Sequence, residues 1–146
     1  MKKRTGDPWM PADEYGRSLK GIGFNLLVTS IEAARSFHTQ VLGAKEVYWD
    51  PDFAVYRGYG ADWLLHADHT YQDHELSGSL TPDIPRGVGV ELRIHGRDPD
   101  AAEAIARDLG YHILAGALDK PHGLREAYIT DQDGYIWVPD VPVKKP

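Results

Sequence analysis

The chain contains no cysteine among its 146 residues. Disulfide bonds, thiolate nucleophiles and thiolate metal ligands are therefore excluded, because each of them needs a cysteine sulfur. A chain of this length can bury enough apolar surface to fold as one ordinary domain without covalent cross-links. The absence of cysteine also fits a reducing compartment, and we expect a cytoplasmic protein.

Basic residues and long apolar runs are also scarce. The chain has 16 Lys and Arg against 22 Asp and Glu, which gives a net charge of -6 and a pI of about 5.6. Its basic clusters lie at the two ends, at residues 2–4 and 144–145. This composition lacks the basic footprint of a nucleic-acid-binding protein, and no apolar run approaches the roughly 20 residues that span a bilayer. We expect neither a nucleic-acid partner nor a membrane partner.

Residues 1–20 form a polar segment without the apolar core of a signal peptide. Trp9, Met10, Tyr15 and Leu19 are nevertheless large apolar side chains that suit a solvated tail poorly. The segment is predicted to be an arm that packs across the body of the protein or across a partner subunit. A partly disordered terminus is the alternative.

One pattern occurs twice along the chain. Residues 21–45 contain an alternating strand and then a helix-like stretch that ends at Leu42-Gly43-Ala44, and residues 87–113 repeat this order up to Leu109-Gly110-Tyr111. Further strand-like runs follow each copy. The repeat predicts two βαβββ units, at residues 21–68 and 87–146, joined by a loop at residues 69–86 that is long enough to be functional.

Turn residues and periodicity place the elements of each unit. Thr29 and Glu32 have the spacing of a capping box, so a helix is predicted over residues 30–42; Asp98 and Pro99 begin the second helix, which ends at Gly110. The predicted strands of the first unit cover residues 22–28, 45–49, 53–59 and 62–67. Those of the second unit cover residues 88–94, 111–115, 125–130 and 135–138.

Two motifs accompany the repeat, Phe37-His38-x-x-Val41-Leu42-Gly43 in the first helix and Asp131-Gln132-Asp133-Gly134-Tyr135 before the last strand. Together they resemble the vicinal oxygen chelate superfamily, which includes glyoxalase I, extradiol dioxygenases and the fosfomycin- and bleomycin-resistance proteins. The usual strings of that superfamily carry a tyrosine at the position of His38 and a proline at the position of Gln132.

The resemblance covers about residues 21–141 and implies an α+β fold. Its tandem βαβββ units would form curved mixed sheets around a shared cleft, with the helices outside. It also implies a homodimer, because members of the superfamily are commonly dimers.

The resemblance further implies where a metal would bind. In metal-dependent members the first and last strands of each unit supply His or Glu ligands. The helix motifs place these positions at Gly23, at Leu64 or one or two residues later, at Gly89 and at Val138. Only His66, two residues beyond Leu64, could supply a ligand, and one histidine does not make a site. We therefore expect the usual metal centre to be absent and predict no cofactor.

Polar and aromatic side chains on the strands suggest a ligand site instead. Alternation places Asn25, Glu91, Arg93, Glu126 and Tyr128 on the faces that would line the cleft. Trp63 and Trp137 are predicted to offer stacking surfaces, and His66 completes the predicted ligand-binding set. Internal ion pairs, Glu91 with Arg93 or Glu126 with Arg125, are the alternative interpretation of the charged residues.

A displaced metal site remains an alternative at the segment that is richest in titratable groups. There His66, Asp68, His69 and His74 could bind a divalent ion, or a histidine could act as a general base. His66, Glu91, Glu126 and Tyr128 are the candidate catalytic residues.

The leading hypothesis is a glyoxalase-like or bleomycin-resistance-like protein that binds a small organic molecule without a metal. The alternatives are a metal-dependent lyase, isomerase or dioxygenase and a non-catalytic dimerisation module.

Overall fold

The computed structural model describes residues 1–144, so residues 145 and 146, which the sequence assigns to the second unit, lie outside the described range. The described chain forms two compact units. The first contains residues 1–33 and 45–82, and the second contains residues 34–44 and those from 83 onward. Each unit contains one four-stranded mixed sheet, which confirms the predicted α+β class.

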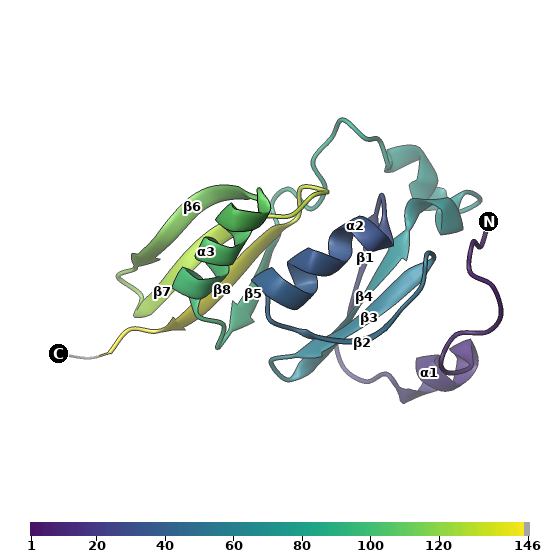
Figure 1. Cartoon of the computed structure of the whole chain (residues 1–146), viewed down its shortest axis with the longest axis horizontal. Coiled ribbons are helices and arrows are strands. Elements are labelled where there is room, and N and C mark those ends of the chain that lie inside the picture. The colour runs from purple at the N-terminus through teal and green to yellow at the C-terminus, as the bar shows by residue number, and fades with distance from the viewer. Residues whose placement is uncertain (145–146) are drawn as a thin grey trace. The chain divides into compact units, whose positions relative to one another are not determined.

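The first sheet has the strand order β1-β4-β3-β2 (Figure 1). Its strands are β1 (Phe24–Val28), β2 (Lys45–Trp49), β3 (Phe53–Gly58) and β4 (Ala61–Ala67). β1 is parallel to β4, and the other neighbours are antiparallel. This arrangement is the predicted βαβββ connection, since a parallel pair needs a crossover that a helix can supply.

Three short helices of the first unit were missed by the sequence analysis. α1 (Ala12–Ser18) lies within the N-terminal arm. The segment after β4, predicted as a loop, contains the 3₁₀ turns η2 (Asp68–Tyr71) and η3 (Glu75–Ser79). All three are too short to show the periodicity by which a helix is recognised in a sequence.

The predicted helix over residues 30–42 is present as α2 (Ile31–Ser36), which continues directly into the π-helical turn η1 (Phe37–Val41). Six side chains of this segment are buried and form its inward-facing stripe: Ile31, Ala34, Phe37, His38, Val41 and Leu42. At its start, the Ser30 hydroxyl accepts the N–H of Ala33 at 3.2 Å, so Ser30 supplies a cap. The boundary between the two compact units falls within α2, after Ala33.

The second sheet has the order β5-β8-β7-β6 and repeats the topology of the first. Its strands are β5 (Glu91–His95), β6 (His112–Asp119), β7 (Leu124–Thr130) and β8 (Ile136–Pro142). The first of them begins three residues later than predicted. Gly87 and Gly89 adopt φ values of +67° and +88°, which are incompatible with an extended strand, and Val88 and Val90 are left exposed.

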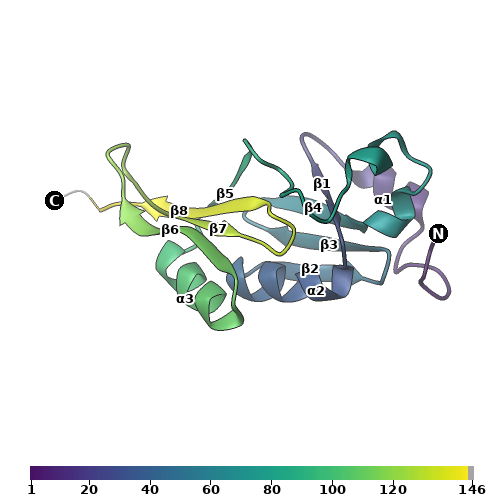
Figure 2. The ribbon, with the colours of Figure 1, turned by 90° about the horizontal axis from the view of Figure 1, so that it is seen from above.

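Helix α3 (Pro99–Leu109) lies along one face of the second sheet (Figure 2). The side chain of Asp98 accepts the N–H of Asp100 at its start, and Gly110, with a φ of +85°, ends it. Arg97 donates to the carbonyl oxygens of Val41 and Gln40, which attaches the segment of residues 34–44 to this unit. None of the helices within residues 1–144 combines the length and the apolar character that crossing a bilayer requires.

Candidate functional site

Alternation along β4 separates two faces of the first sheet. Trp63, Leu65 and Ala67 are buried on one face, while Leu64 and His66 point to the other. On this second face, His66 is paired across the ladder with Phe53 of β3. It is the face against which the N-terminal arm packs.

An aromatic cluster fixes the arm on the sheet. The Trp9 ring stacks on Tyr48 with a centroid distance of 4.7 Å, and it also contacts Tyr15 of α1 and Phe53 of β3, at 5.2 and 6.0 Å. Such contacts bury apolar area and add about 0.5–1.5 kcal/mol per aromatic pair. The predicted packing of the arm across the body is therefore confirmed.

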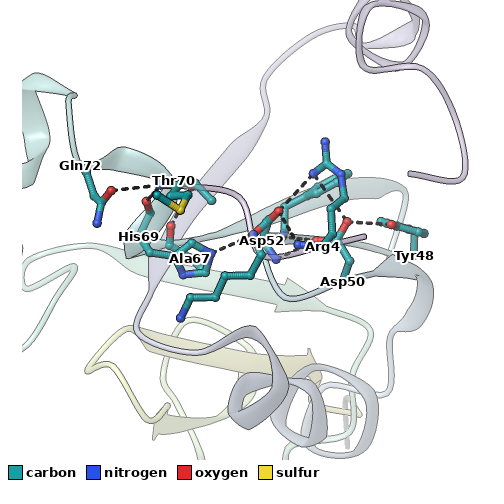
Figure 3. A network of polar contacts seen from close by, with 11 residues as sticks. Arg4, Tyr48, Asp50, Asp52, Ala67, His69, Thr70 and Gln72 are labelled. Carbon is teal, nitrogen blue, oxygen red and sulfur yellow. Dashed lines mark hydrogen bonds and ion pairs between the residues drawn. The ribbon is translucent and has the colours of Figure 1, made fainter. Parts of the chain in front are cut away.

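A polar network anchors the beginning of the arm (Figure 3). The Asp52 carboxylate accepts the backbone N–H groups of Lys3 at 2.6 Å and Arg4 at 3.2 Å, and its Oδ1 lies 2.7 Å from Nε2 of His69. The Arg4 guanidinium lies 3.5 Å from Asp52 and 3.7 Å from Asp50. We call this group the Asp52 anchor; it consists of Lys3, Arg4, Asp50, Asp52 and His69.

The turn before β3 positions Asp52. The Asp50 side chain accepts the N–H groups of Asp52 and Phe53 and the hydroxyl of Tyr48, which is the local bonding expected of an aspartate in a turn. Burial and the bond to Asp50 raise the pKa of Tyr48 to about 12, so Tyr48 remains a neutral donor. Burial alone would raise the pKa of Asp52, but the hydrogen bonds from His69, Lys3 and Arg4 outweigh burial and lower it.

Between the arm and the sheet lies a cavity of about 280 Å³. Pro8, Trp9, Met10, Phe53 and Leu64 contribute apolar wall, and Arg4, Asp52, His66 and Thr70 contribute polar groups. A wider groove of about 900 Å³ runs beside it and shares Trp9, Met10, Tyr15, Leu19 and Leu64 with it. Small-molecule sites are typically apolar concavities of this kind with a few converging polar groups.

His66 belongs to a short chain of hydrogen bonds. Its Nδ1 lies 2.5 Å from Oδ1 of Asn25, and Nδ2 of Asn25 donates to the hydroxyl of Tyr71 at 2.8 Å. The ring stacks on Phe53, with centroids 5.6 Å apart and planes 18° apart. Burial lowers the pKa of His66, and the nearby Asp50 carboxylate offsets only part of this effect. Of the predicted ligand-binding residues, Asn25 and His66 thus lie together.

The second unit gathers most of the other predicted residues into an ion-pair network. Arg93 donates to Glu91 at 2.5 Å and to Glu126, and it lies 3.3 Å from Asp140 without the alignment of a hydrogen bond. Tyr128 is also hydrogen-bonded to Arg93. Glu126 and Asp140 face each other on β7 and β8, and both are buried.

Two histidines extend this network. Nδ1 of His95 lies 2.7 Å from Asp140, and Nε2 of His122 lies 3.3 Å from Glu126. Burial alone would raise the pKa of Glu126, but Arg93 and His122 outweigh burial and lower it. The guanidinium therefore neutralises carboxylates of its own unit. Of the two internal pairs considered from the sequence, Glu91 with Arg93 is present, whereas Arg125 pairs with Asp100 and Asp119.

The two tryptophans expected to stack on a ligand are core residues. Trp63 is 3 % exposed and Trp137 is 1 % exposed. Trp137 packs edge-on against His38, and its Nε1 donates to Asp131 at 3.0 Å. Side chains alternate between the two faces of a strand. The Trp63 indole therefore lies on the face opposite to His66, and the Trp137 indole lies on the face opposite to Arg93.

The residues present do not fit the metal centre of the resembled superfamily. Gly23, Gly89 and Val138 carry no side-chain donor, and a Cβ built on either glycine would meet open space. The remaining position, at Leu64 or one or two residues later, offers only His66. In the displaced cluster, His66 bonds to Asn25, His69 to Asp52 and His74 to the N–H of Leu76. Across residues 1–144 no three His, Asp or Glu side chains are grouped so that they could hold a metal ion.

Asp52, Phe53 and Leu64 were not predicted as parts of the ligand site, and no ligand role was predicted for Trp9. The large apolar residues of the arm were a usable signal, because they predicted that the arm packs on something. The anchor residue Asp52 carried no such signal, since its partners Lys3 and Arg4 are 49 and 48 positions away.

Comparison with solved structures identifies the fold. A glyoxalase-related enzyme from Fulvimarina pelagi superposes with a TM-score of 0.68 at 21% identity, over 84% of this chain and 87% of that chain. A glyoxalase/bleomycin resistance protein/dioxygenase from Nocardioides gives 0.62 at 21% identity, over 92% and 94%. A protein of the same description from Burkholderia phytofirmans gives 0.67 at 16% identity, over 83% and 97%.

The chain thus has the fold of the vicinal oxygen chelate superfamily, as its motifs predicted. At these identities the likeness concerns the fold alone. No family model matches the sequence, and neither does any curated protein.

Proposed function

We propose that this chain is a glyoxalase-like or bleomycin-resistance-like protein that binds a small, largely apolar organic molecule without a metal ion. The observation that carries the proposal is the cavity of about 280 Å³ between the N-terminal arm and the first sheet. A cavity of roughly 150 Å³ lined by apolar side chains holds one benzene molecule. The cavity therefore suits a ligand of one or two rings.

The chemistry of the wall supports an apolar ligand. Trp9 and Phe53 present aromatic surface to the cavity, and Leu64 adds aliphatic surface. Of the charged groups in the lining, Arg4 and Asp52 neutralise each other, and Lys2 is the third. The polar face of the second sheet is a weaker candidate, because Arg93 is engaged by carboxylates of its own unit.

The fold is compatible with several activities, and structures that share it are described as glyoxalase-related, as bleomycin resistance proteins and as dioxygenases. We favour a binder over a metal enzyme for this chain. The resemblance places the ligand positions of the superfamily at Gly23, Gly89, Val138 and Leu64 or one or two residues later. Of these only His66 can coordinate a metal, and one histidine does not make a site.

A thermal-shift screen with one- and two-ring compounds tests the binding proposal. A ligand at a hundred times its Kd should add about 2.7 kcal/mol to the stability of the folded state. Leu64→Trp fills the cavity and should abolish the shift, whereas Leu114→Trp, at an exposed position of the second sheet, should retain it. If no compound stabilised the wild type, or if Leu64→Trp responded as the wild type does, the proposal would be wrong.

Metal analysis of protein purified without chelator tests the proposal that the ligand is bound without a metal ion. We expect no stoichiometric divalent metal. Stoichiometric Fe, Mn, Ni or Zn that disappeared in His66→Ala would contradict the metal-free proposal and would instead support an enzyme with a displaced metal site.

A further inference from the structure

The hydrogen-bond chain behind His66 determines which ring nitrogen carries a proton. The amide nitrogen of Asn25 donates to Tyr71, which leaves the amide oxygen for His66. An amide oxygen only accepts hydrogen bonds, so Nδ1 of His66 must be the donor in this contact. In a neutral imidazole the other nitrogen, Nε2, then carries a lone pair.

The neutral form is favoured at this position. His66 is half-buried and stacked on Phe53, and burial lowers its pKa. Within residues 1–144, Nε2 has no hydrogen-bond partner, while the histidine side chain contributes to the wall of the cavity. His66 can thus offer the cavity one oriented acceptor in a mostly apolar lining.

We propose that the bound molecule is a planar, uncharged compound with a hydroxyl or N–H group on its ring, which donates a hydrogen bond to Nε2 of His66. This inference rests on the proposed function, since it describes a ligand of the same cavity. The aromatic body lies against Trp9, Phe53 and Leu64. Asn25 and Tyr71 are positioning residues, because they act on the ligand only through the imidazole.

Charge selects among the possible donors. An ammonium group would lose its hydration in an apolar cavity. Lys2 and Arg4, which also line the cavity, would attract an anion, but an anion at Nε2 would meet the lone pair of a neutral imidazole. A neutral donor such as a phenol avoids both costs. A ring that bears only acceptors would leave Nε2 without a partner, and a polar group that a ligand shields from water without pairing costs affinity.

The test compares two isomers, 4-ethylphenol and 4-methylanisole, by isothermal titration. They have the same atoms and nearly the same size, but only the phenol can donate. We expect the wild type to bind the phenol about fivefold more tightly, the ratio that one net hydrogen bond provides. His66→Phe keeps an aromatic ring and should reduce the ratio to about one while the anisole still binds.

His112→Phe is the matched control, because His112 is exposed at the start of β6 in the second unit and does not line the cavity; the wild-type ratio should persist in it. Asn25→Leu removes the acceptor of Nδ1 and should also lower the ratio, which provides a second variant if His66→Phe does not fold. Equal binding of the isomers by the wild type, or an unchanged ratio in His66→Phe, would overturn the inference alone. If neither isomer nor any other ring compound bound, the proposed function would fail as well.

A ligand-independent measurement addresses the same point. Nitrogen-15 NMR of the histidine side chains should find the proton of His66 on Nδ1 at neutral pH. A proton on Nε2 would overturn the inference, because the imidazole would then offer a donor to the cavity.

Discussion

Replacing Asp52 by asparagine should release the N-terminal arm from the first sheet. The substitution keeps the size of the side chain but removes the charge that the Asp52 anchor shares. Asp52 accepts hydrogen bonds from two backbone N–H groups of the arm and lies 2.7 Å from Nε2 of His69. The amide group of asparagine has a single acceptor oxygen, and its nitrogen would face one of these donors.

The magnitude follows from these contacts. A hydrogen bond to a charged group contributes about 1.5–3 kcal/mol, and the asparagine would lose at least one of the contacts and weaken the rest. We expect Asp52→Asn to lower the free energy of unfolding by about 2–4 kcal/mol at pH 7. The folded pKa of Asp52 is depressed, so this stabilisation is present above the unfolded pKa and is lost only as the pH falls through the folded value.

Two assays measure the effect. Urea unfolding gives the free energy, and limited trypsin digestion after Lys3 and Arg4 reports detachment of the arm, which should be faster in the variant. Asp13→Asn is the matched control, because Asp13 lies on the same arm in an exposed pair with Arg17 and should cost less than about 1 kcal/mol. If Asp52→Asn had the same free energy of unfolding as the wild type and its arm stayed protected from trypsin, the anchor would not hold the arm.

Three further predictions concern the second unit. Burial lowers the pKa of His38 to about 3, so its contribution to the free energy of unfolding is complete above pH 6.5 and is lost as the pH falls. Between pH 7.5 and 5 the free energy of unfolding of the wild type should fall by about 2 kcal/mol, a loss that His38→Gln should not show. Urea unfolding at both pH values measures this, with the exposed His112→Gln expected to follow the wild type. Arg93→Met leaves two buried carboxylates without their cation and should lower the free energy of unfolding in urea by about 3–5 kcal/mol. Arg107→Met, on the surface of α3, should lower it by less than about 1 kcal/mol, and similar losses in the two variants would contradict this account. Gly134→Ala should cost at least about 2 kcal/mol in a circular-dichroism melt, since it adds a contact of 2.8 Å with a proline backbone to the strain of a φ of +95°, and a wild-type melting curve would refute the clash.

Repetition and periodicity predicted the architecture well, because the strand and helix pattern of each repeat depends on residues that are close together in the sequence. The buried stripe from Ile31 to Leu42 follows directly from helical spacing. The start of β5 was predicted too early because Val88 and Val90 continue the alternation, whereas the backbone of Gly89 is left-handed. Alternation in a sequence does not reveal the φ of a glycine.

The candidate site was less predictable because it depends on partners distant in the sequence. Arg93 has the chemistry of a ligand-binding residue, but its availability is decided by Glu126 on another strand. Trp63 was predicted to stack on a ligand because it has a large aromatic ring. Its side chain lies on the buried face of the sheet, whereas that of its neighbour Leu64 points to the opposite face. Asn25 and His66 were both predicted as ligand-binding residues, and the parallel pairing of β1 with β4 brings them together.

The division of the chain within α2 has a consequence for how the protein is synthesised and folded. Residues 34–44 belong to the second compact unit but are encoded within the first sequence repeat. On the ribosome, this segment emerges well before the strands with which it shares a core, so the second unit can be completed only late in translation. A gene cut between the repeats would separate Phe37 and Val41 from that core, and we expect the second fragment not to fold alone. The repeats are units of sequence, whereas the compact units of the structure are interleaved.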